Sequence, residues 1–379
     1  MRMAFFMTDT MGIILTKDSD KKLYDLTSNR AVAAVPFGVR YRIIDFILSC
    51  MVNSGISNVG VVTHTDYQSL MDHLGSGKEW DLDRKLSGIF IFPPNIRKES
   101  VDRSKGTLDE LYSIMHYFRR SKERYVVISE SGVIFNTLLD DAMDYHLSHE
   151  ADITVFYNKM EPHKIKELTT CAVLDVDKKG QVIGLEINPR LPRANLISMN
   201  IYITNKALLE TLVDECIAQG LDDFESGALR RNLTNLRVFG YEYGGYVARI
   251  DTVRSYYKYN MELLNRDVIN ELFAPDIPVY TKVKDEVPTM YGSQASVENS
   301  LIADGCVIDG SVRNSILFRG VQISKNVKVM NSIIMQNSEV HEESVLENVI
   351  LDKDVIVRVG KRLTGQADYP VLIGKGGVI

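Results

Sequence analysis

The sequence has little that would suit the protein to an oxidising compartment or a membrane. Its four cysteines lie far apart and match neither a metal site nor a redox motif; they are Cys50, Cys171, Cys216 and Cys306. No run of about 18 apolar residues occurs, so no membrane span is predicted. The first 20 residues are interrupted by Thr8, Asp9 and Thr10 and lack a small-residue cleavage site, which predicts no secretion signal. We therefore expect a cytoplasmic protein with reduced cysteines.

Positive charge is not in excess either. The 379 residues include 44 basic and 50 acidic ones, which gives a net charge of −6. We therefore expect no nucleic-acid or membrane partner, although one local basic pocket would be enough to bind a small anion. Apolar residues make up 45% and charged residues 25%, a composition that excludes a disordered chain.

Apolar runs alternate with helical patterns in the first two-thirds of the chain. Strands are predicted at Met11–Thr16, Asn58–Thr63 and Tyr125–Ser129, and a helix at Ile43–Ile56. A further helix is predicted from Thr107, whose side chain would form a capping box with Glu110. This order predicts an α/β fold with a mostly parallel sheet, whose ligands would lie at the carboxyl ends of the strands.

The last quarter follows a different pattern. The phrases NSLI, NSIL, NSII and NVIL begin at Asn299, Asn314, Asn331 and Asn348, at spacings of 15, 17 and 17 residues. Such a period, built of six-residue apolar steps, predicts one triangular β-helix coil per repeat, with Asn or Gly in the corners. An irregular β-sandwich is the alternative. We divide the chain into an α/β domain (1–265), a proline-containing linker (266–290) and a β-helix domain (291–379).

Several segments resemble the glucose-1-phosphate adenylyltransferase (ADP-glucose pyrophosphorylase) family, in the same order along the chain. They are AVPFGVRYRIIDFILS (34–49), NSGI (53–56), EWDLDR (79–84), KGT (105–107), LISMNIYI (196–203) and DTVRSYYKYNMELL (251–264). The resemblance implies a Rossmann-like nucleotidyltransferase domain followed by a left-handed parallel β-helix. Members of the family join ATP to glucose 1-phosphate in the presence of Mg²⁺, giving ADP-glucose and pyrophosphate for glycogen synthesis.

The sequence departs from the family pattern wherever that chemistry is carried. In place of the glycine-rich phosphate loop stand Lys17, Asp18, Asp20 and Lys22. Ser131 and Arg249 occupy the positions of the two metal carboxylates, and Asn188 that of the sugar-phosphate lysine. A hydroxyl is a poor substitute for a carboxylate on Mg²⁺, and a cation repels the metal. We therefore predict no catalytic residues, no metal and no cofactor, with Mg²⁺ bound only if the protein is active after all.

Other residues could still bind ligands. Arg40 and Arg42 would point to one side of an extended segment, and Arg40 falls where catalytic relatives have a lysine implicated in binding a phosphorylated effector. Surface salt bridging is the alternative. A residual ligand pocket could include Lys105, Thr107, Glu186 and Ser198. Lys17, Lys21, Lys22 and Arg30 could form a new phosphate site, but the interspersed aspartates favour a solvated loop of mixed charge.

The leading hypothesis is a regulatory, catalytically silent or very weak subunit, similar to the non-catalytic subunit of bacterial glycogen biosynthesis. It would assemble with a catalytic homologue, in a tetramer of both subunit types. The alternatives are an active sugar-phosphate nucleotidyltransferase with atypical residues and a homo-oligomeric sugar-phosphate sensor. The apolar segment Tyr369–Ile379 is expected to pack on the β-helix or on a neighbouring subunit.

Overall fold

The computed structural model describes residues 7–16, 21–64, 66–85, 87–94, 106–165, 168 and 170–379. By their internal contacts these residues form two compact units, neither of which is continuous in sequence. Unit 1 comprises residues 1–17, 47–67 and 75–247, and unit 2 comprises 18–46, 68–74 and 248–379. The predicted domain boundaries at 265 and 290 stay a prediction. No helix of the described residues is both long and apolar enough to cross a membrane.

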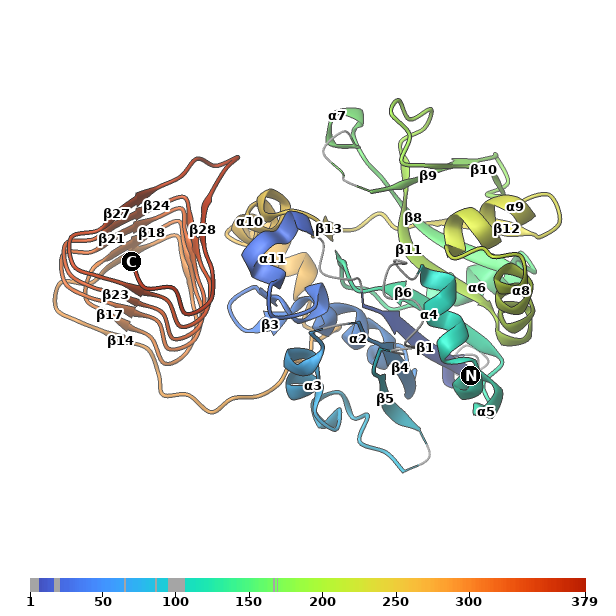
Figure 1. Ribbon diagram of the computed structural model, residues 1–379, viewed down its shortest axis with the longest axis horizontal. Coiled ribbons are helices and arrows are strands. Elements are labelled where there is room, and N and C mark those ends of the chain that lie inside the picture. The colour runs from blue at the N-terminus through green and yellow to red at the C-terminus, as the bar shows by residue number, and fades with distance from the viewer. Residues whose placement is uncertain are drawn as a thin grey trace. The chain divides into compact units, whose positions relative to one another are not determined.

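Unit 1 is built on a nine-stranded mixed sheet (Figure 1). Its strands and β7 are β1 (Thr10–Leu15), β4 (Asn58–Val62), β5 (Gly88–Phe92), β6 (Tyr125–Glu130), β7 (Val133–Ile134), β8 (Ile153–Lys159), β9 (Ala172–Val176), β10 (Val182–Ile187), β11 (Leu196–Asn205) and β12 (Val238–Glu242). The central strands follow the order β11-β6-β1-β4-β5, in which β6, β1, β4 and β5 run parallel. This confirms the predicted α/β fold, with β11 pairing antiparallel to β6.

The helices of unit 1 pack their apolar faces on this sheet. They are η3 (Lys78–Trp80), α4 (Thr107–Ser113), α5 (Met115–Arg120), α6 (Asp140–Ser148), α7 (Pro162–Ile165), α8 (Lys206–Ala218), η4 (Phe224–Leu229) and α9 (Arg230–Asn232), and α2 (Ile43–Asn53) runs from unit 2 into unit 1. The predicted stripe is buried, since Leu108, Leu111 and Phe118 belong to the main core. That core leaves no exposed apolar side on strands β1 and β6, as their continuous runs predicted.

The predicted capping box at Thr107 is wrong. Thr107 is the first residue of α4, not the cap, and its hydroxyl accepts the N–H of Phe224 at 2.8 Å. Glu110 lies 3.0 Å from Nε2 of His64 instead of turning back on the helix. Gly106 precedes the helix because a Cβ there would lie 2.0 Å from the carbonyl oxygen of Asp222. Tertiary contacts therefore fix this helix start.

Unit 2 contains the three-sided coil visible in Figure 1, and it confirms the predicted β-helix. Its strands stack as three parallel sheets, β14-β17-β20-β23-β26, β15-β18-β21-β24-β27 and β16-β19-β22-β25-β28. They are β14 (Met290–Tyr291), β15 (Ser296–Glu298), β16 (Leu301–Ile302), β17 (Val307–Ile308), β18 (Ser311–Arg313), β19 (Ile316–Leu317), β20 (Gln322–Ile323), β21 (Lys328–Met330), β22 (Ile333–Ile334), β23 (Glu339–Val340), β24 (Val345–Glu347), β25 (Val349–Leu351), β26 (Ile356–Val357), β27 (Arg362–Thr364) and β28 (Val371–Ile373). The coil is a left-handed parallel β-helix with an aliphatic interior.

The repeated NS phrase has a direct structural explanation. Each of its asparagines turns a corner in the left-handed region, at φ of 41°, 46°, 46° and 52° for Asn299, Asn314, Asn331 and Asn348. The serine that follows supplies a hydroxyl to the next coil: Ser315 Oγ accepts the N–H of Ser332, and Ser332 Oγ that of Val349, both at 3.1 Å. The phrase therefore encodes a corner and a bond between coils.

Residues from before α2 also belong to unit 2. Its remaining elements are η1 (Lys21–Thr27), η2 (Val32–Ala34), β2 (Pro36–Phe37), β3 (Tyr41–Arg42), α3 (Gln68–Leu74), β13 (Ala248–Arg249), α10 (Val253–Glu262) and α11 (Arg266–Leu272). Arg30 forms a buried ion pair with Asp352 of the β-helix, with side-chain exposures of 6% and 1%. Helix α10 contributes Tyr257, whose hydroxyl donates to Asn348 Oδ1 at 3.1 Å. These contacts build the early segment onto the coil.

The apolar segment Tyr369–Ile379 packs on the chain's own β-helix, as one of the two predicted outcomes. Strand β28 extends the third sheet by pairing with β25. Ile379 then donates its N–H to the carbonyl oxygen of Ile356 at 3.0 Å. The segment thus completes the last coil.

Replacing Asp352 with asparagine should lower the free energy of unfolding by about 3–5 kcal/mol, because Arg30 would keep a buried charge with no counter-charge. Asp368→Asn is the matched control, since it breaks an exposed pair with Arg254 in the same unit (exposures 65% and 48%) and should cost less than about 1 kcal/mol. Calorimetric unfolding of both variants checks this, and equal losses would contradict a special role for the buried pair.

Candidate functional sites

The predicted place for a ligand in unit 1, the carboxyl ends of β1 and β6, holds only a narrow cavity. Its described lining residues are Leu15, Thr107, Leu111, Ile128, Glu130, Asn200, Tyr202, Asp223, Phe224 and Glu225. The cavity volume is about 10 Å³, which is about the room that one water molecule needs. Three of these residues are acidic and none is basic. Such a lining opposes a triphosphate or a sugar phosphate.

Glu225 occupies the centre of this acidic group. It accepts a hydrogen bond from the hydroxyl of Tyr202 at 2.6 Å. Burial, aided by the nearby charge of Glu130, raises the pKa of Glu225 to about 7, although the bond from Tyr202 acts in the opposite direction. The side chain therefore changes its charge near neutral pH, where an ordinary glutamate is ionised.

The predicted degenerate positions lie where their roles become structural. Ser131 is fully buried directly after β6, and its N–H donates to the carbonyl oxygen of Leu15 at 3.1 Å. Asn188 adopts φ of 49° and exchanges two hydrogen bonds with the backbone of Cys171, both at 2.8 Å. Arg249 is buried in β13 of unit 2, and Lys22 is exposed in η1. Lys17, Asp18 and Asp20 lie outside the described residues.

The residues of the predicted residual pocket come together only in part. Thr107 lines the cavity, and Ser198 is buried close by, with its hydroxyl bonded to Glu225 and Tyr202. Glu186 instead forms an ion pair with Arg193 at 3.2 Å and is not among the described lining residues. Lys105 lies outside the described residues.

Mg²⁺, which the family reaction requires, has no suitable ligand set among the described residues. No group of three or more His, Cys, Asp or Glu side chains is arranged there to hold a metal ion. The position after β6 carries the hydroxyl of Ser131, and Arg249 carries a guanidinium. Neither group is a ligand that a hard divalent cation prefers.

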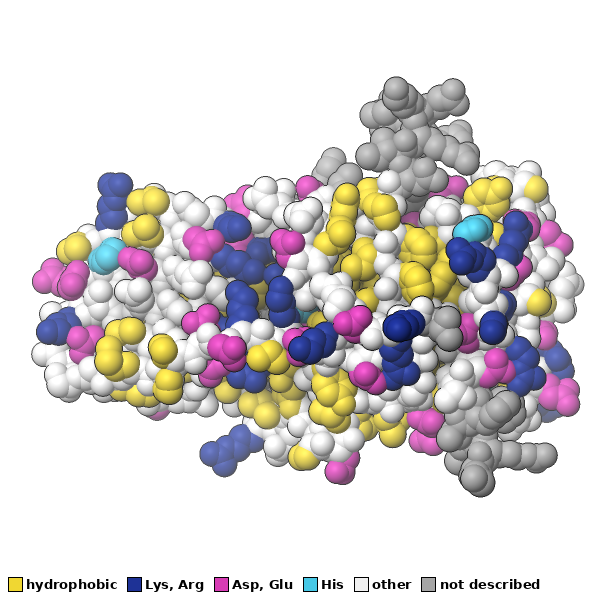
Figure 2. Space-filling model, turned by 90° about the horizontal axis from the view of Figure 1, so that it is seen from below, with side chains coloured by type: hydrophobic (Ala, Val, Ile, Leu, Met, Phe, Trp, Pro, Cys, Tyr) yellow, Lys and Arg dark blue, Asp and Glu magenta, His cyan; other side chains and the backbone are white. Residues whose placement is uncertain are grey.

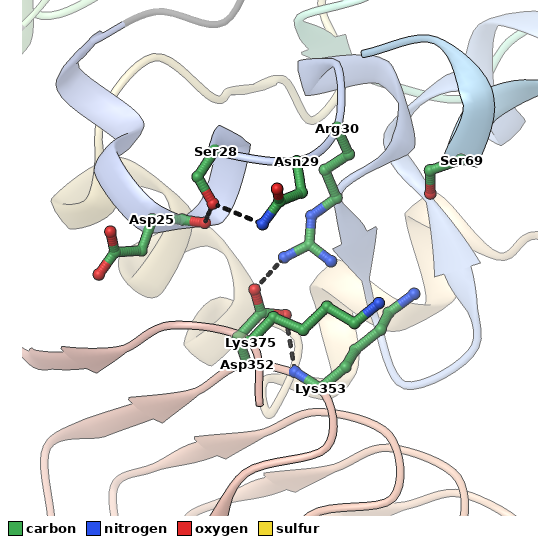
Figure 3. Close-up of a pocket in the computed structure, with 8 residues that line it drawn as sticks. All are labelled: Asp25, Ser28, Asn29, Arg30, Ser69, Asp352, Lys353 and Lys375. Carbon is green, nitrogen blue, oxygen red and sulfur yellow. Dashed lines mark hydrogen bonds and ion pairs between the residues drawn. The ribbon is translucent and has the colours of Figure 1, made fainter. Parts of the chain in front are cut away.

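Unit 2 carries a very different cavity, of about 220 Å³. Its described lining residues are Pro36, Arg40, Tyr41, Arg42, Asp72, His73, Lys282, Lys284, Arg319, Gln336, Asn337, Lys353 and Asp354. A smaller cavity of about 60 Å³ shares Lys353 and adds Asp25, Ser28, Asn29, Arg30, Ser69, Asp352 and Lys375 (Figure 3). Together the linings hold eight basic and four acidic side chains. We call this pair of cavities the basic cavity.

Arg40 and Arg42 both line the basic cavity, but they are held differently. The Arg40 guanidinium is 43% exposed and lies 3.2 Å from Asp304. Arg42 is anchored by bonds to the carbonyl oxygen and hydroxyl of Ser69, at 2.6 and 2.9 Å. Burial lowers the pKa of Arg42 to about 10, so this guanidinium is still charged at neutral pH. Figure 2 shows Lys and Arg side chains gathered in the left half of that face.

One wall of the basic cavity comes from a corner of the β-helix, which we did not predict. On each coil the residue before a left-handed corner contributes a side chain, and these residues are Asp304, Arg319, Gln336, Lys353 and Lys375. Backbone bonds link neighbouring coils, as in Asn337 N–H to Arg319 and Gly376 N–H to Lys353, at 3.1 and 2.9 Å. We call these five residues the corner ladder. The repeated period, read one residue ahead of each Gly, Asn or Asp corner, is the sequence signal that could have found it.

The corner ladder holds cations close together. Burial, together with the charges of Arg42 and Arg30, lowers the pKa of Lys353 to about 7. Burial and the charge of Arg40 likewise lower the pKa of Arg319. An anion in the basic cavity would relieve this repulsion, so the cavity is suited to bind phosphate or carboxylate groups.

Comparison with known proteins agrees with this architecture. Residues 11–243 match the family model of nucleotidyl transferases, and residues 285–367 match that of the GlmU-like C-terminal hexapeptide. A glucose-1-phosphate adenylyltransferase of Bacillus cytotoxicus is 32% identical over 371 residues, covering 97% of this chain and 98% of its own. The chain belongs to the ADP-glucose pyrophosphorylase family. Glycogen biosynthesis protein GlgD of Bacillus subtilis, strain 168, is 37% identical over 372 residues, covering 98% of this chain and 97% of its own.

Within the ADP-glucose pyrophosphorylase family, this chain combines a matching fold with altered residues at the sheet edge. The nucleotidyl transferase match spans β1 and β6, and so includes the edge where Ser131 and Glu225 lie. The hexapeptide match spans the corner residues from Asp304 to Lys353. The family relationship therefore covers the regions of both cavities.

Glu225→Gln should stabilise the protein at pH 8 and change little at pH 4.5. The carboxyl pKa is raised in the folded state, so its favourable protonated form is lost as pH rises toward 7, and ionisation then costs about 1–3 kcal/mol. Glutamine keeps an acceptor for Tyr202 but cannot ionise. Denaturation curves across this pH range test the expectation, with Glu342→Gln as the exposed control. Parallel curves for wild type and Glu225→Gln would contradict it.

Proposed function

We propose that this protein is a regulatory, catalytically silent or very weak subunit of ADP-glucose pyrophosphorylase in glycogen biosynthesis. The observation that carries the proposal is the contrast between its two sites. The sheet edge of unit 1 has an acidic cavity of about 10 Å³, while unit 2 has a basic cavity of about 220 Å³. The first is suited neither to ATP nor to glucose 1-phosphate, and the second is suited to an anionic effector.

Loss of catalysis follows from several changes that act together. Ser131 offers no carboxylate, Glu225 and Tyr202 occupy the space at the strand ends, and Asn188 is committed to Cys171. Phosphoryl-type reactions depend on positioning and on positive charge around the phosphates, and each loss removes part of that stabilisation. Similarity to GlgD, which is named for glycogen biosynthesis, supports the same pathway for this chain.

The proposed partner is a catalytic homologue, and the assembly is a tetramer containing both subunit types. A shared fold gives both subunits matching β-helices through which like surfaces can associate. Binding that favours the active state of the partner by about 1–3 kcal/mol would change its effector or substrate affinity by about 5–150-fold.

Two alternatives remain. An active nucleotidyltransferase with atypical residues would have to open the cavity at Glu225. A homo-oligomeric sensor of sugar phosphates is favoured by the basic cavity itself, which needs no partner to bind an anion. Assembly and activity distinguish the three functions.

The purified protein should give no more than trace ADP-glucose with ATP, glucose 1-phosphate and Mg²⁺, and Ser131→Asp should not restore activity because the other changes remain. Mixed with a catalytic homologue, it should elute as a heteromer of higher mass and alter the kinetics of that enzyme. A turnover of about 1–10³ per second by the protein alone would contradict the silent subunit. Separate elution with unchanged kinetics, also after co-expression, would favour the sensor.

A sugar bisphosphate should bind more tightly than Mg²⁺-ATP, with Arg40→Gln weakening it about tenfold, as expected for one lost charge-assisted contact. Lys328→Gln, an exposed change on β21, is the control. Because a bound anion raises the lowered pKa of Lys353, binding at pH 7.5 should take up protons. Calorimetric titration in buffers of different ionisation heat measures both effects. Tighter binding of Mg²⁺-ATP would contradict the assignment.

A further inference from the structure

Lys353 differs from an ordinary surface lysine in its surroundings. It lines both parts of the basic cavity and is only partly exposed. Its neighbours in these linings are mostly cations: Arg30 from the segment after η1, Arg42 from β3, and Lys375 from the next coil. Figure 3 shows the side chains of Lys353 and Lys375 extending into the smaller cavity beside Arg30.

The acidic groups around Lys353 are mostly engaged elsewhere. Asp352 pairs with Arg30 and accepts the backbone N–H of Lys353 at 2.7 Å, so that it holds the main chain and not the amine. Asp354 accepts from the amide of Asn337 at 3.3 Å. Asp25 and Asp72 lie in the linings of the smaller and the larger part, and Lys282 and Lys284 add further positive charge to the larger part.

This arrangement produces a nucleophile beside a phosphate site. Neighbouring coils of a β-helix lie about 4.8 Å apart, so Lys375 sits one coil from Lys353 and disfavours its ammonium form. The same cations attract a doubly charged phosphate and stabilise it as it leaves. A cavity of about 220 Å³ leaves space for a small acyl group attached to that phosphate.

We propose that Lys353 is a covalent modification site, acylated by acyl phosphates that bind in the basic cavity. The amine lone pair of Lys353 attacks the carbonyl carbon of the acyl phosphate, and a C–N bond forms. The bond between that carbon and the phosphate oxygen breaks, and its electron pair leaves with inorganic phosphate. The amine loses one proton to phosphate or water, and a neutral amide remains.

Acylation would remove one cation from the corner ladder. The modified cavity should then bind a free sugar bisphosphate less tightly, because the amide occupies space and carries no charge. The proposal uses the cavity assigned above but requires neither a silent active site nor a partner subunit, so it can fail independently of the proposed function.

The test is incubation of the whole purified protein with acetyl phosphate at pH 7, followed by peptide mapping by mass spectrometry. Lys353 should acetylate about tenfold faster than exposed Lys328, since a larger share of its amine is neutral at that pH. Its rate should level off above about pH 7–8, whereas that of an ordinary lysine keeps rising. Inorganic phosphate in excess should protect Lys353 and leave Lys328 unaffected.

Lys375→Gln provides a second measurement, because it removes an exposed side chain and should leave the fold intact. Without the neighbouring charge, acetylation of Lys353 at pH 7 should slow several-fold. Lys353→Arg should abolish the fast phase altogether. Equal rates at Lys353 and Lys328, no protection by phosphate, or an unchanged rate in Lys375→Gln would each overturn the proposal.

Discussion

The buried ion pair between Arg30 and Asp352 is the interaction on which unit 2 depends. It joins positions 322 residues apart, and both side chains are almost fully excluded from solvent. A buried charge is costly unless it is paired, so the segment that carries Arg30 can pack here only when the β-helix presents Asp352. Asp352 in turn precedes Lys353, so the same contact sets one wall of the basic cavity.

The position of Arg42 depends on a second buried contact in the same unit. Asp45 accepts the backbone N–H of Arg42 at 2.9 Å and lies 2.6 Å from Nε2 of His73. Burial lowers the pKa of His73, which keeps the imidazole neutral as a partner for Asp45 in the interior. The cavity is therefore built from fixed side chains, and little ordering would be needed when an anion binds.

Periodicity was enough to predict the sheet strands and the β-helix, because each signal lies within a few neighbouring residues. Asn331 predicted a corner, and the corner is there. Thr107 misled us because its hydroxyl serves Phe224, 117 residues later, a contact that no local pattern contains. Glu225 was missed for the same reason: nothing in its own segment reveals that Tyr202 and a narrow cavity await it.

Arg30 shows how a correct local pattern can still leave a role unresolved. Its neighbours Asp25 and Lys22 favoured a solvated loop, and both of those side chains are indeed exposed. Arg30 alone turns inward to Asp352. Arg40 and Arg42 could be placed on one side from their alternation, but the remaining basic groups come from distant coils. Only the stacked register of the β-helix brings Arg319, Lys353 and Lys375 into one row.

Because the corner ladder places one side chain per coil, insertions and deletions act on it in quanta. A single extra residue within a coil would move every later corner out of phase and break the row. A whole additional coil of 17 residues, the length between the corners at Gly320, Asn337 and Asp354, would leave the row intact and lengthen it by one step. The length of the binding wall and the charge at each step can thus change separately over evolution, without rebuilding the rest of the unit.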